Sequence, residues 1–153
     1  MRILVNTEKC CGCRICELQC SFHHTKSFSP RHSRIHVTKI DNKGFDYPHV
    51  CHQCNTCPPA NMCPMQALTK AESGGIMVQR DKCVHCRKCA ESCSYGAIRY
   101  DSTITPVLCD LCGGTPVCVE GCPTKALTYA EGKEPPAVET VFRELMKKWS
   151  INE

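Results

Sequence analysis

The chain has 153 residues, and 17 of them are cysteine, a share above the roughly 8–10% at which cysteines form a structural framework. Four Phe, four Tyr and one Trp supply too little side-chain bulk for a large hydrocarbon core. The formal net charge of +4 comes from scattered Lys and Arg residues that are not interleaved with aromatic residues, which argues against nucleic-acid binding.

The N-terminal segment predicts a strand followed by the first of four cysteine motifs. This motif has the spacing Cys10-x2-Cys13-x2-Cys16-x3-Cys20, and Cys11 falls outside its register, so we interpret Cys11 as a thiol that binds no metal. Residues 21–50 then form an insert with several histidines. We interpret the insert as a polar surface loop that ends in a short strand at 34–40 and braces the fold or touches a partner. The histidines of the insert are His23, His24, His32, His36 and His49.

Motifs two and three lie on either side of a predicted β-hairpin. Residues 67–71 and 76–79 are β-prone runs separated by Ser73-Gly74-Gly75. His52 and His85 occupy non-ligand positions within the two motifs, where we expect either a solvated side chain or a hydrogen bond that tunes a metal centre. The two motifs read Cys51-x2-Cys54-x2-Cys57-x5-Cys63 and Cys83-x2-Cys86-x2-Cys89-x3-Cys93.

Motif four, Cys109-x2-Cys112-x5-Cys118-x3-Cys122, precedes a predicted strand at 127–129. After Pro135-Pro136, apolar residues recur at helical spacing and predict an amphipathic helix within the tail 132–153. A small protein has little apolar surface to receive six large side chains, so we favour docking of this helix to a partner over packing on its own chain. The apolar residues are Val138, Val141, Phe142, Leu145, Met146 and Trp149.

The spacing of the cysteines predicts iron–sulfur clusters. Motifs one and three match the bacterial ferredoxin run, in which three closely spaced thiolates bind one cubane and the fourth cysteine binds its neighbour. Zinc takes four ligands as two pairs, so a triplet with a detached fourth cysteine suits zinc poorly. The odd number of cysteines and the lack of an export signal disfavour a disulfide scaffold and predict a cytoplasmic location. No run approaches the ~18 apolar residues of a membrane span, so we expect no direct membrane insertion.

The four motifs form an internal repeat. ILVNTEKCCGCRICELQCS from residue 3 aligns without a gap to IMVQRDKCVHCRKCAESCS from residue 76, and CPMQALTKAE from residue 63 aligns to CPTKALTYAE from residue 122. Motifs two and three therefore form one ferredoxin-like module, and the two remaining halves pair around it. Sequential pairing, motif one with two and three with four, is the alternative.

Nested pairing predicts an α+β fold of two bacterial-ferredoxin-like modules, with small β-hairpins and short helices around the clusters. The inner module is 51–100, the outer module is 1–50 with 101–131, and the tail 132–153 is a C-terminal amphipathic helix. Ligand exchange then assigns sixteen cysteines to four [4Fe–4S] clusters. The four ligand sets are Cys10, Cys13 and Cys16 with Cys122; Cys109, Cys112 and Cys118 with Cys20; Cys51, Cys54 and Cys57 with Cys93; and Cys83, Cys86 and Cys89 with Cys63.

The sequence resembles the iron–sulfur subunits of the dimethyl sulfoxide reductase group, in particular the small subunits of tungsten-containing aldehyde oxidoreductases and of tungsten-type benzoyl-CoA reductases. The resemblance covers residues 1–131 and rests on CRICELQCSFHH at 13–24, SRI at 33–35, CHQC at 51–54 and CDLCGGTPVCVEGCPTKAL at 109–127. It implies nested pairing. It also implies a relay between a pterin-bound tungsten or molybdenum centre in a large subunit and an external ferredoxin or another redox subunit.

Motif two departs from that family at its third cysteine. The family usually leaves four residues between the second and third cysteines and three between the third and fourth, which puts the third cysteine at a position occupied here by Pro59. We expect Cys57 to take its place, because the same CxxCxxC turn occurs in motifs one and three. If Cys57 is not a ligand, the chain holds three clusters.

The sequence has no Ser–His–Asp arrangement, phosphate loop or nucleotide fingerprint. Every predicted ligand set is complete with four cysteines, so no iron is left open to a substrate. We therefore expect an electron-transfer subunit with no catalytic site of its own. The alternatives are a free polyferredoxin that serves several enzymes and a metal-stabilised interaction module without a redox role.

Overall fold

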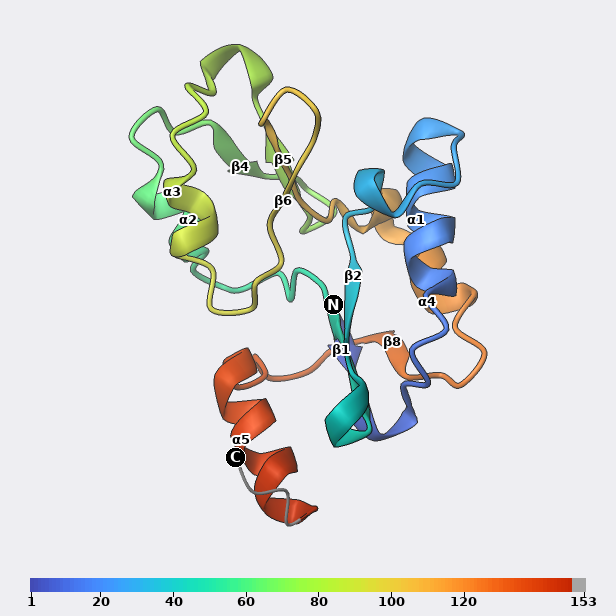
Figure 1. Cartoon of the computed structure of the whole chain (residues 1–153). Helices are drawn as coiled ribbons and strands as arrows, with labels where there is room; N and C mark the ends of the chain where they lie inside the picture. The colour runs from blue at the N-terminus through green and yellow to red at the C-terminus, as the bar shows by residue number, and fades with distance from the viewer. Residues whose placement is uncertain (150–153) are drawn as a thin grey trace.

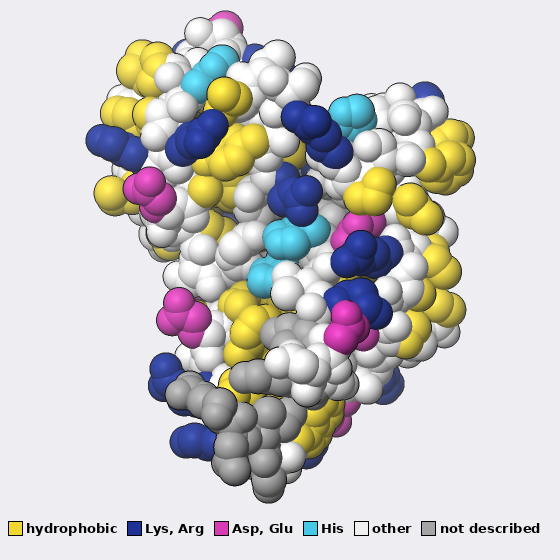
Figure 2. All heavy atoms as spheres, in the orientation of Figure 1, with side chains coloured by type: hydrophobic (Ala, Val, Ile, Leu, Met, Phe, Trp, Pro, Cys, Tyr) yellow, Lys and Arg dark blue, Asp and Glu magenta, His cyan; other side chains and the backbone are white. Residues whose placement is uncertain are grey.

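Two-stranded antiparallel sheets and short helices make up the computed structural model, which describes residues 1–149 apart from the side chains at 40 and 43. Four such sheets are present among these residues, and the predicted mixed α+β class is confirmed. Several cysteines lie within the buried apolar cluster beside Ile3, Ile35 and Leu127, so sulfur fills space that hydrocarbon fills in other small proteins. On the face shown in Figure 2, Lys and Arg side chains are scattered among hydrophobic and acidic ones.

The two ends of the cysteine-bearing chain are joined by one sheet. Strand β1 (Arg2–Val5) pairs antiparallel with β8 (Leu127–Ala130), with Ile3 opposite Tyr129 and Val5 opposite Leu127. Ile3 and Leu127 are almost fully buried, because alternate side chains of both strands face the interior. Both predicted strands are therefore confirmed, and Figure 1 shows them side by side.

The predicted hairpin between motifs two and three is also present. Strand β4 (Leu68–Lys70) pairs with β5 (Ile76–Val78), and the turn closes through a hydrogen bond from the Ala71 N–H to the Gly75 carbonyl. The hairpin abuts motif four, because the Ile76 N–H donates to the Cys109 carbonyl at 3.1 Å. A Cβ atom on Gly75 would lie 2.4 Å from the backbone of Asp110, so only glycine permits this close approach.

Short helices carry or follow the cysteine motifs. Helix α1 (Ile15–Thr25) packs against α4 (Val117–Glu120), and α2 (Pro58–Met62) packs against α3 (Lys88–Glu91). In Figure 1, α2 and α3 lie with the β4–β5 hairpin, whereas α1 and α4 lie on the other side of the molecule. The single-turn 3-10 helices are η1 (Thr7–Lys9), η2 (Pro30–His32), η3 (Asp41–Lys43), η4 (Arg80–Lys82) and η5 (Leu111–Gly114).

The insert is more ordered than a surface loop. It begins within α1 and contains a hairpin of β2 (His36–Ile40) and β3 (Phe45–His49), so the predicted strand is confirmed and a second strand was missed. The rings of His36 and His49 stack with centroids 4.4 Å apart, and both residues are partly or fully buried. The prediction of a polar surface loop is therefore wrong for these two histidines. A further short pair, β6 (Arg99–Tyr100) with β7 (Pro106–Val107), was not predicted.

The C-terminal helix α5 (Val138–Lys148) is present as predicted, but it packs on its own chain. The ring of Phe142 lies 5.4 Å from that of Phe45 and 5.3 Å from that of Tyr47, and Trp149 lies 5.9 Å from Phe45. Leu145 is buried in the same contact. The expectation that this apolar face docks on a partner is therefore wrong, because the unpredicted β2–β3 hairpin receives it.

Candidate metal centres

Backbone turns of unusual handedness present the cysteines of each motif. In motif one, Gly12 and Arg14 have φ values of 61° and 60°, and the aligned residues of motif three, His85 and Arg87, have values of 57° and 63°. Left-handed residues between ligands reverse the chain and turn successive N–H groups inward, which builds a concave site for an anionic group. The internal repeat is thus a repeat of backbone conformation as well as of spacing.

Three of the predicted ligand sets each line one pocket. The four cysteines of a set come from two motifs that are distant in sequence, as ligand exchange requires. The three groups are Cys10, Cys13, Cys16 and Cys122; Cys51, Cys54, Cys57 and Cys93; and Cys63, Cys83, Cys86 and Cys89.

The fourth predicted set also comes together, where α1 packs against α4. Cys20 lies within electrostatic range of Cys109, Cys112 and Cys118. The structure therefore gathers all sixteen predicted ligands into four groups of four. Cys11 is exposed at the edge of the first group.

Burial disfavours ionisation of the thiols in these groups unless a cation is bound. Burial raises the pKa of Cys16 and of Cys51 to about 12, and burial also raises the pKa of Cys109 well above its ordinary value. Burial disfavours the charged thiolate form that iron requires, so the positive charge of bound iron must compensate for the lost solvation. A protonated thiol is neutral and needs no compensating charge. All seventeen cysteines are free in the structure, which leaves them available as ligands.

Backbone N–H groups already point at one of the sulfurs. Burial acts to raise the pKa of Cys122, but hydrogen bonds from the Leu127 N–H, the Thr124 hydroxyl and the Ala126 N–H outweigh it and lower that pKa. Such bonds favour a thiolate over a thiol and are the usual surroundings of a cluster sulfur. The donor sets and their surroundings therefore fit cubane clusters.

Cys57 stands at the place where the sequence departs from the usual spacing. It caps the N-terminus of α2, and Pro58 and Pro59 form the first turn of that helix. Its side chain lines the same pocket as Cys51, Cys54 and Cys93. The helix start thus presents Cys57, and not a residue at position 59, together with the other three thiols.

His52 is buried beside the second pocket and is not the solvated residue that the sequence allowed. It is 1% exposed, its Nδ1 lies 2.9 Å from the Ile3 carbonyl oxygen, and its ring contacts Tyr95 edge-on. The bond to a carbonyl places the proton on Nδ1 in the neutral ring. His85, in contrast, is exposed at the rim of the third pocket.

The groups follow one another through the molecule. Cys109 lies within electrostatic range of Cys51, and Cys118 lies within range of Cys16. Motif two contributes cysteines to both the Cys51 group and the Cys83 group, so these two groups are neighbours. The order is therefore the Cys83 group, the Cys51 group, the Cys109 group and the Cys10 group.

Comparison with known proteins agrees with this arrangement. A family model described as a 4Fe–4S dicluster domain matches residues 43–132. A polyferredoxin-like subunit of aliphatic sulfonate oxidoreductase from Pyrococcus furiosus is 37% identical over 151 residues, which cover 95% of this chain and 87% of the relative. The electron transport protein HydN of Escherichia coli is 33% identical, with 82% of this chain and 85% of the relative covered. A subunit of anaerobic dimethyl sulfoxide reductase from Shigella flexneri is 30% identical, with 82% of this chain and 70% of the relative covered.

A solved structure shares the fold. The active-site complex BamBC of benzoyl coenzyme A reductase, with benzoyl-CoA bound, contains a protein that matches 97% of this chain and is itself covered to 90%, with a TM-score of 0.51 and 23% identity. Within residues 1–149, no helix is long and apolar enough to cross a membrane. The matches confirm the family resemblance found in the motifs, and with it the role of a protein that carries electrons and has no catalytic site of its own. The chain belongs to the 4Fe–4S dicluster family and is an electron-transfer iron–sulfur subunit of the kind found in dimethyl sulfoxide reductase.

Proposed function

We propose that this chain relays single electrons through four [4Fe–4S] clusters between a large tungsten- or molybdenum-pterin subunit and an external carrier. One observation carries the number of clusters: sixteen cysteines, including Cys57, lie in four groups of four. When bound, the clusters supply one-electron chemistry. The chain supplies thiolates, N–H donors and a buried setting, and it offers no position where a substrate could reach iron.

Exposure of the cysteines supports a relay with two open ends. The two groups at the ends of the order each include an exposed cysteine, Cys86 and Cys13. The two middle groups have none, and they contain the buried Cys20, Cys51 and Cys109. An electron can therefore enter or leave at either end, while the cysteines of the middle groups are buried or only partly exposed.

One end has a surface suited to a redox partner. Met65 and Val84 line the pocket of the Cys83 group and are 45% and 57% exposed, and Met62 nearby is 57% exposed. Exposed apolar side chains around a redox centre favour close approach of a second protein. We assign this end to the external carrier and the Cys10 end to the pterin subunit.

The nested modules and the location belong to the same proposal. The β1–β8 sheet joins residues 1–50 to 101–131, and the β4–β5 hairpin lies within 51–100, which supports an outer and an inner module. The seventeen free thiols suit a reducing compartment, so we propose that the relay works in the cytoplasm.

Anaerobic isolation with the native partner tests the proposal. We expect co-purification with a much larger protein that contains tungsten or molybdenum, and about sixteen irons per relay chain. Cys57→Ser should lose or alter one cluster while the electron paramagnetic resonance signals of the other three persist. Elution near 17.1 kDa would favour a free polyferredoxin. Iron near twelve, with Cys57→Ser indistinguishable from the unmodified protein, would favour a three-cluster subunit.

A further inference from the structure

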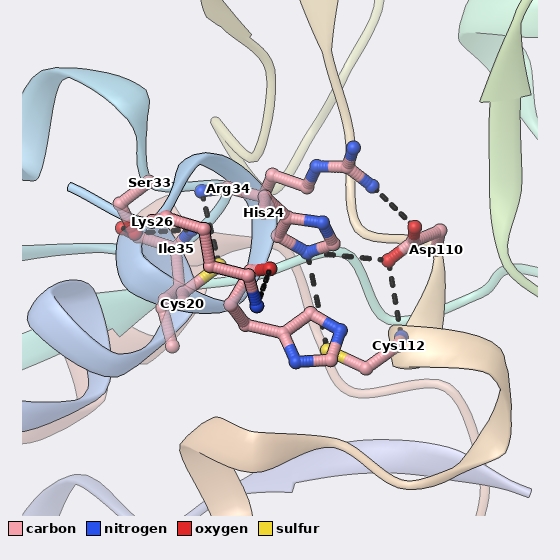
Figure 3. A network of polar contacts seen from close by, with 9 residues as sticks. Cys20, His24, Lys26, Ser33, Arg34, Ile35, Asp110 and Cys112 are labelled. Carbon is pink, nitrogen blue, oxygen red and sulfur yellow. Dashed lines mark hydrogen bonds and ion pairs between the residues drawn. The ribbon is translucent and has the colours of Figure 1, made fainter.

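Two residues of the insert contact the sulfurs of one cysteine group. The backbone N–H of Arg34 donates a hydrogen bond to the Cys20 Sγ at 3.3 Å. The guanidinium of the same residue lies 2.6 Å from the Asp110 carboxylate, which itself accepts a bond from the Cys112 N–H at 3.0 Å. Figure 3 shows Arg34 connecting the two sides of this group, one on α1 and the other on motif four.

The imidazole of His24 completes the network. Its Nε2 lies 3.5 Å from the Asp110 Oδ1 and 3.9 Å from the Cys112 Sγ (Figure 3). A carboxylate and a thiolate both accept hydrogen bonds, so the surroundings place a proton on Nε2 and make it a donor. The ring of His23 packs edge-on against His24 at 4.9 Å and helps to hold its orientation.

The charges in this network are close to balanced. Arg34 contributes a permanent positive charge. Asp110 contributes the carboxylate that lies 2.6 Å from the Arg34 guanidinium, so the two side chains form an ion pair. The Arg34 and Asp110 side chains are 25% and 30% exposed, so solvent screens them only in part. Removal of either partner would leave the other charge uncompensated beside the sulfurs.

The equivalent inner group has different neighbours. The residue after its first cysteine is His52, at the place that Asp110 takes in the Cys109 group, and His52 bonds to the Ile3 carbonyl. The nearby acidic residue is Glu134, whose carboxylate accepts a hydrogen bond from the N–H of Asn55, the residue after Cys54. An arginine lies near this group too: Arg2 of strand β1 donates a hydrogen bond to the Asn55 side chain at 3.2 Å and lies 3.8 Å from the Glu134 carboxylate. Both groups therefore have an arginine–carboxylate pair nearby, and the Cys20 group has in addition the Arg34 N–H and the His24 imidazole at its sulfurs.

We propose that Arg34 and His24 are positioning residues that raise the reduction potential of the cluster held by Cys20, Cys109, Cys112 and Cys118. The inference rests on the proposed ligand sets. A reduced cluster carries one more negative charge than an oxidised one, so N–H donors and a nearby cation stabilise the reduced form. The insert therefore gives this middle cluster two sulfur contacts, from the Arg34 N–H and the His24 imidazole, that the cysteine motifs do not provide.

A charge series in the full-length, cluster-loaded protein tests this proposal. Potentials are read by redox titration with electron paramagnetic resonance, and iron is measured for every variant. Arg34→Gln should lower the potential of one cluster, because the Asp110 carboxylate loses its partner. Asp110→Asn should raise the potential of the same cluster, because Arg34 is then unopposed. The double variant should return towards the unmodified value.

Two further substitutions separate the charge of Arg34 from the hydrogen bond of His24. Arg34→Lys keeps the charge and the backbone N–H, so the potential should remain close to that of the unmodified protein. His24→Leu removes the donor and should lower the same potential, whereas His24→Gln can retain a donor and should shift it less. Arg143→Gln, which removes one positive charge at an exposed position of α5, is the matched control and should leave the potential of this cluster unchanged.

The results distinguish this inference from the proposed function. Absence of a cluster at these cysteines in the unmodified protein would overturn both. Full iron content with Arg34→Gln and Asp110→Asn shifting in the same direction, or not at all, would overturn the tuning role alone. If Arg34→Gln loses its cluster, the proposal is tested with Asp110→Asn and Arg34→Lys instead. An unchanged potential in Asp110→Asn would then reject the proposal.

Discussion

The contact between α5 and the β2–β3 hairpin should depend on one aromatic ring. Phe142 meets Phe45, Tyr47 and His49 at centroid distances of 5.4, 5.3 and 6.5 Å. A fully buried Phe replaced by Ala costs about 3–5 kcal/mol, and each aromatic pair contributes about 0.5–1.5 kcal/mol beyond its area. Because Phe142 is only half-buried, we expect Phe142→Ala to weaken docking of the helix by about 2–3 kcal/mol.

Amide hydrogen exchange of α5 measures this change directly. Since about 1.4 kcal/mol is a factor of ten, backbone amides of the helix should exchange roughly 30- to 150-fold faster in Phe142→Ala. Arg143→Ala, an exposed position on the same helix, should leave the rates within about threefold. Iron content should stay unchanged in both variants. Unchanged exchange in Phe142→Ala, with weaker binding of the large subunit, would show that the ring serves the partner and that our account of the packing fails.

Three other perturbations have clear expected results. A fragment of residues 51–100 should reconstitute two clusters on its own. If it fails to do so while a fragment spanning motifs one and two succeeds, sequential pairing would be favoured. Gly75→Ala should lower the thermal midpoint without removing a ligand, because the new Cβ meets the Asp110 backbone, and a stability equal to that of the unmodified protein would contradict this contact. Burial lowers the pKa of His36 from 6.5 to about 3, so the folded protein holds this histidine neutral while the unfolded chain protonates it below pH 6.5. The contribution of buried, neutral His36 to stability is therefore complete above pH 6.5 and is lost as the pH falls towards 3. His36→Phe should keep the stack on His49 and flatten the fall in thermal midpoint between pH 7 and 5, and an unaltered slope would exclude His36 as its source.

The repeated part of the chain could be predicted because spacing, turns and strands agree there. The strands at both ends and the hairpin between motifs two and three were predicted from short β-prone runs next to the cysteines and from the internal repeat. Helix α1 was missed, although Cys16 and Cys20 are four residues apart, which is one helical turn. Ligand spacing was interpreted only as a metal pattern, and the same spacing also carries a secondary-structure signal.

The position of the tail helix could not be deduced from its own sequence. An amphipathic pattern shows which face is apolar, but it does not identify the surface that covers that face. Phe45 and Tyr47 form that surface only because Gly44, at a φ of 70°, lets β2 and β3 turn back on each other. With that hairpin unrecognised, the chain had no visible place for six apolar side chains.

The same insert explains how a duplicated ligand pattern can serve unlike redox roles. Each cluster site offers four cysteine sulfurs, so the kind of ligand alone cannot set different potentials along the relay. The differences must come from residues outside the repeat. Residues 21–50 have no counterpart between motifs three and four of similar length, and they supply Arg34 and His24 to one middle site. The tail contributes Glu134, close to the other middle site. The insert therefore brings the Arg34 N–H and the His24 imidazole to the sulfurs of one central site, while the tail places Glu134 beside Arg2 at its twin. Because these surroundings differ, we expect the two central clusters to differ in reduction potential.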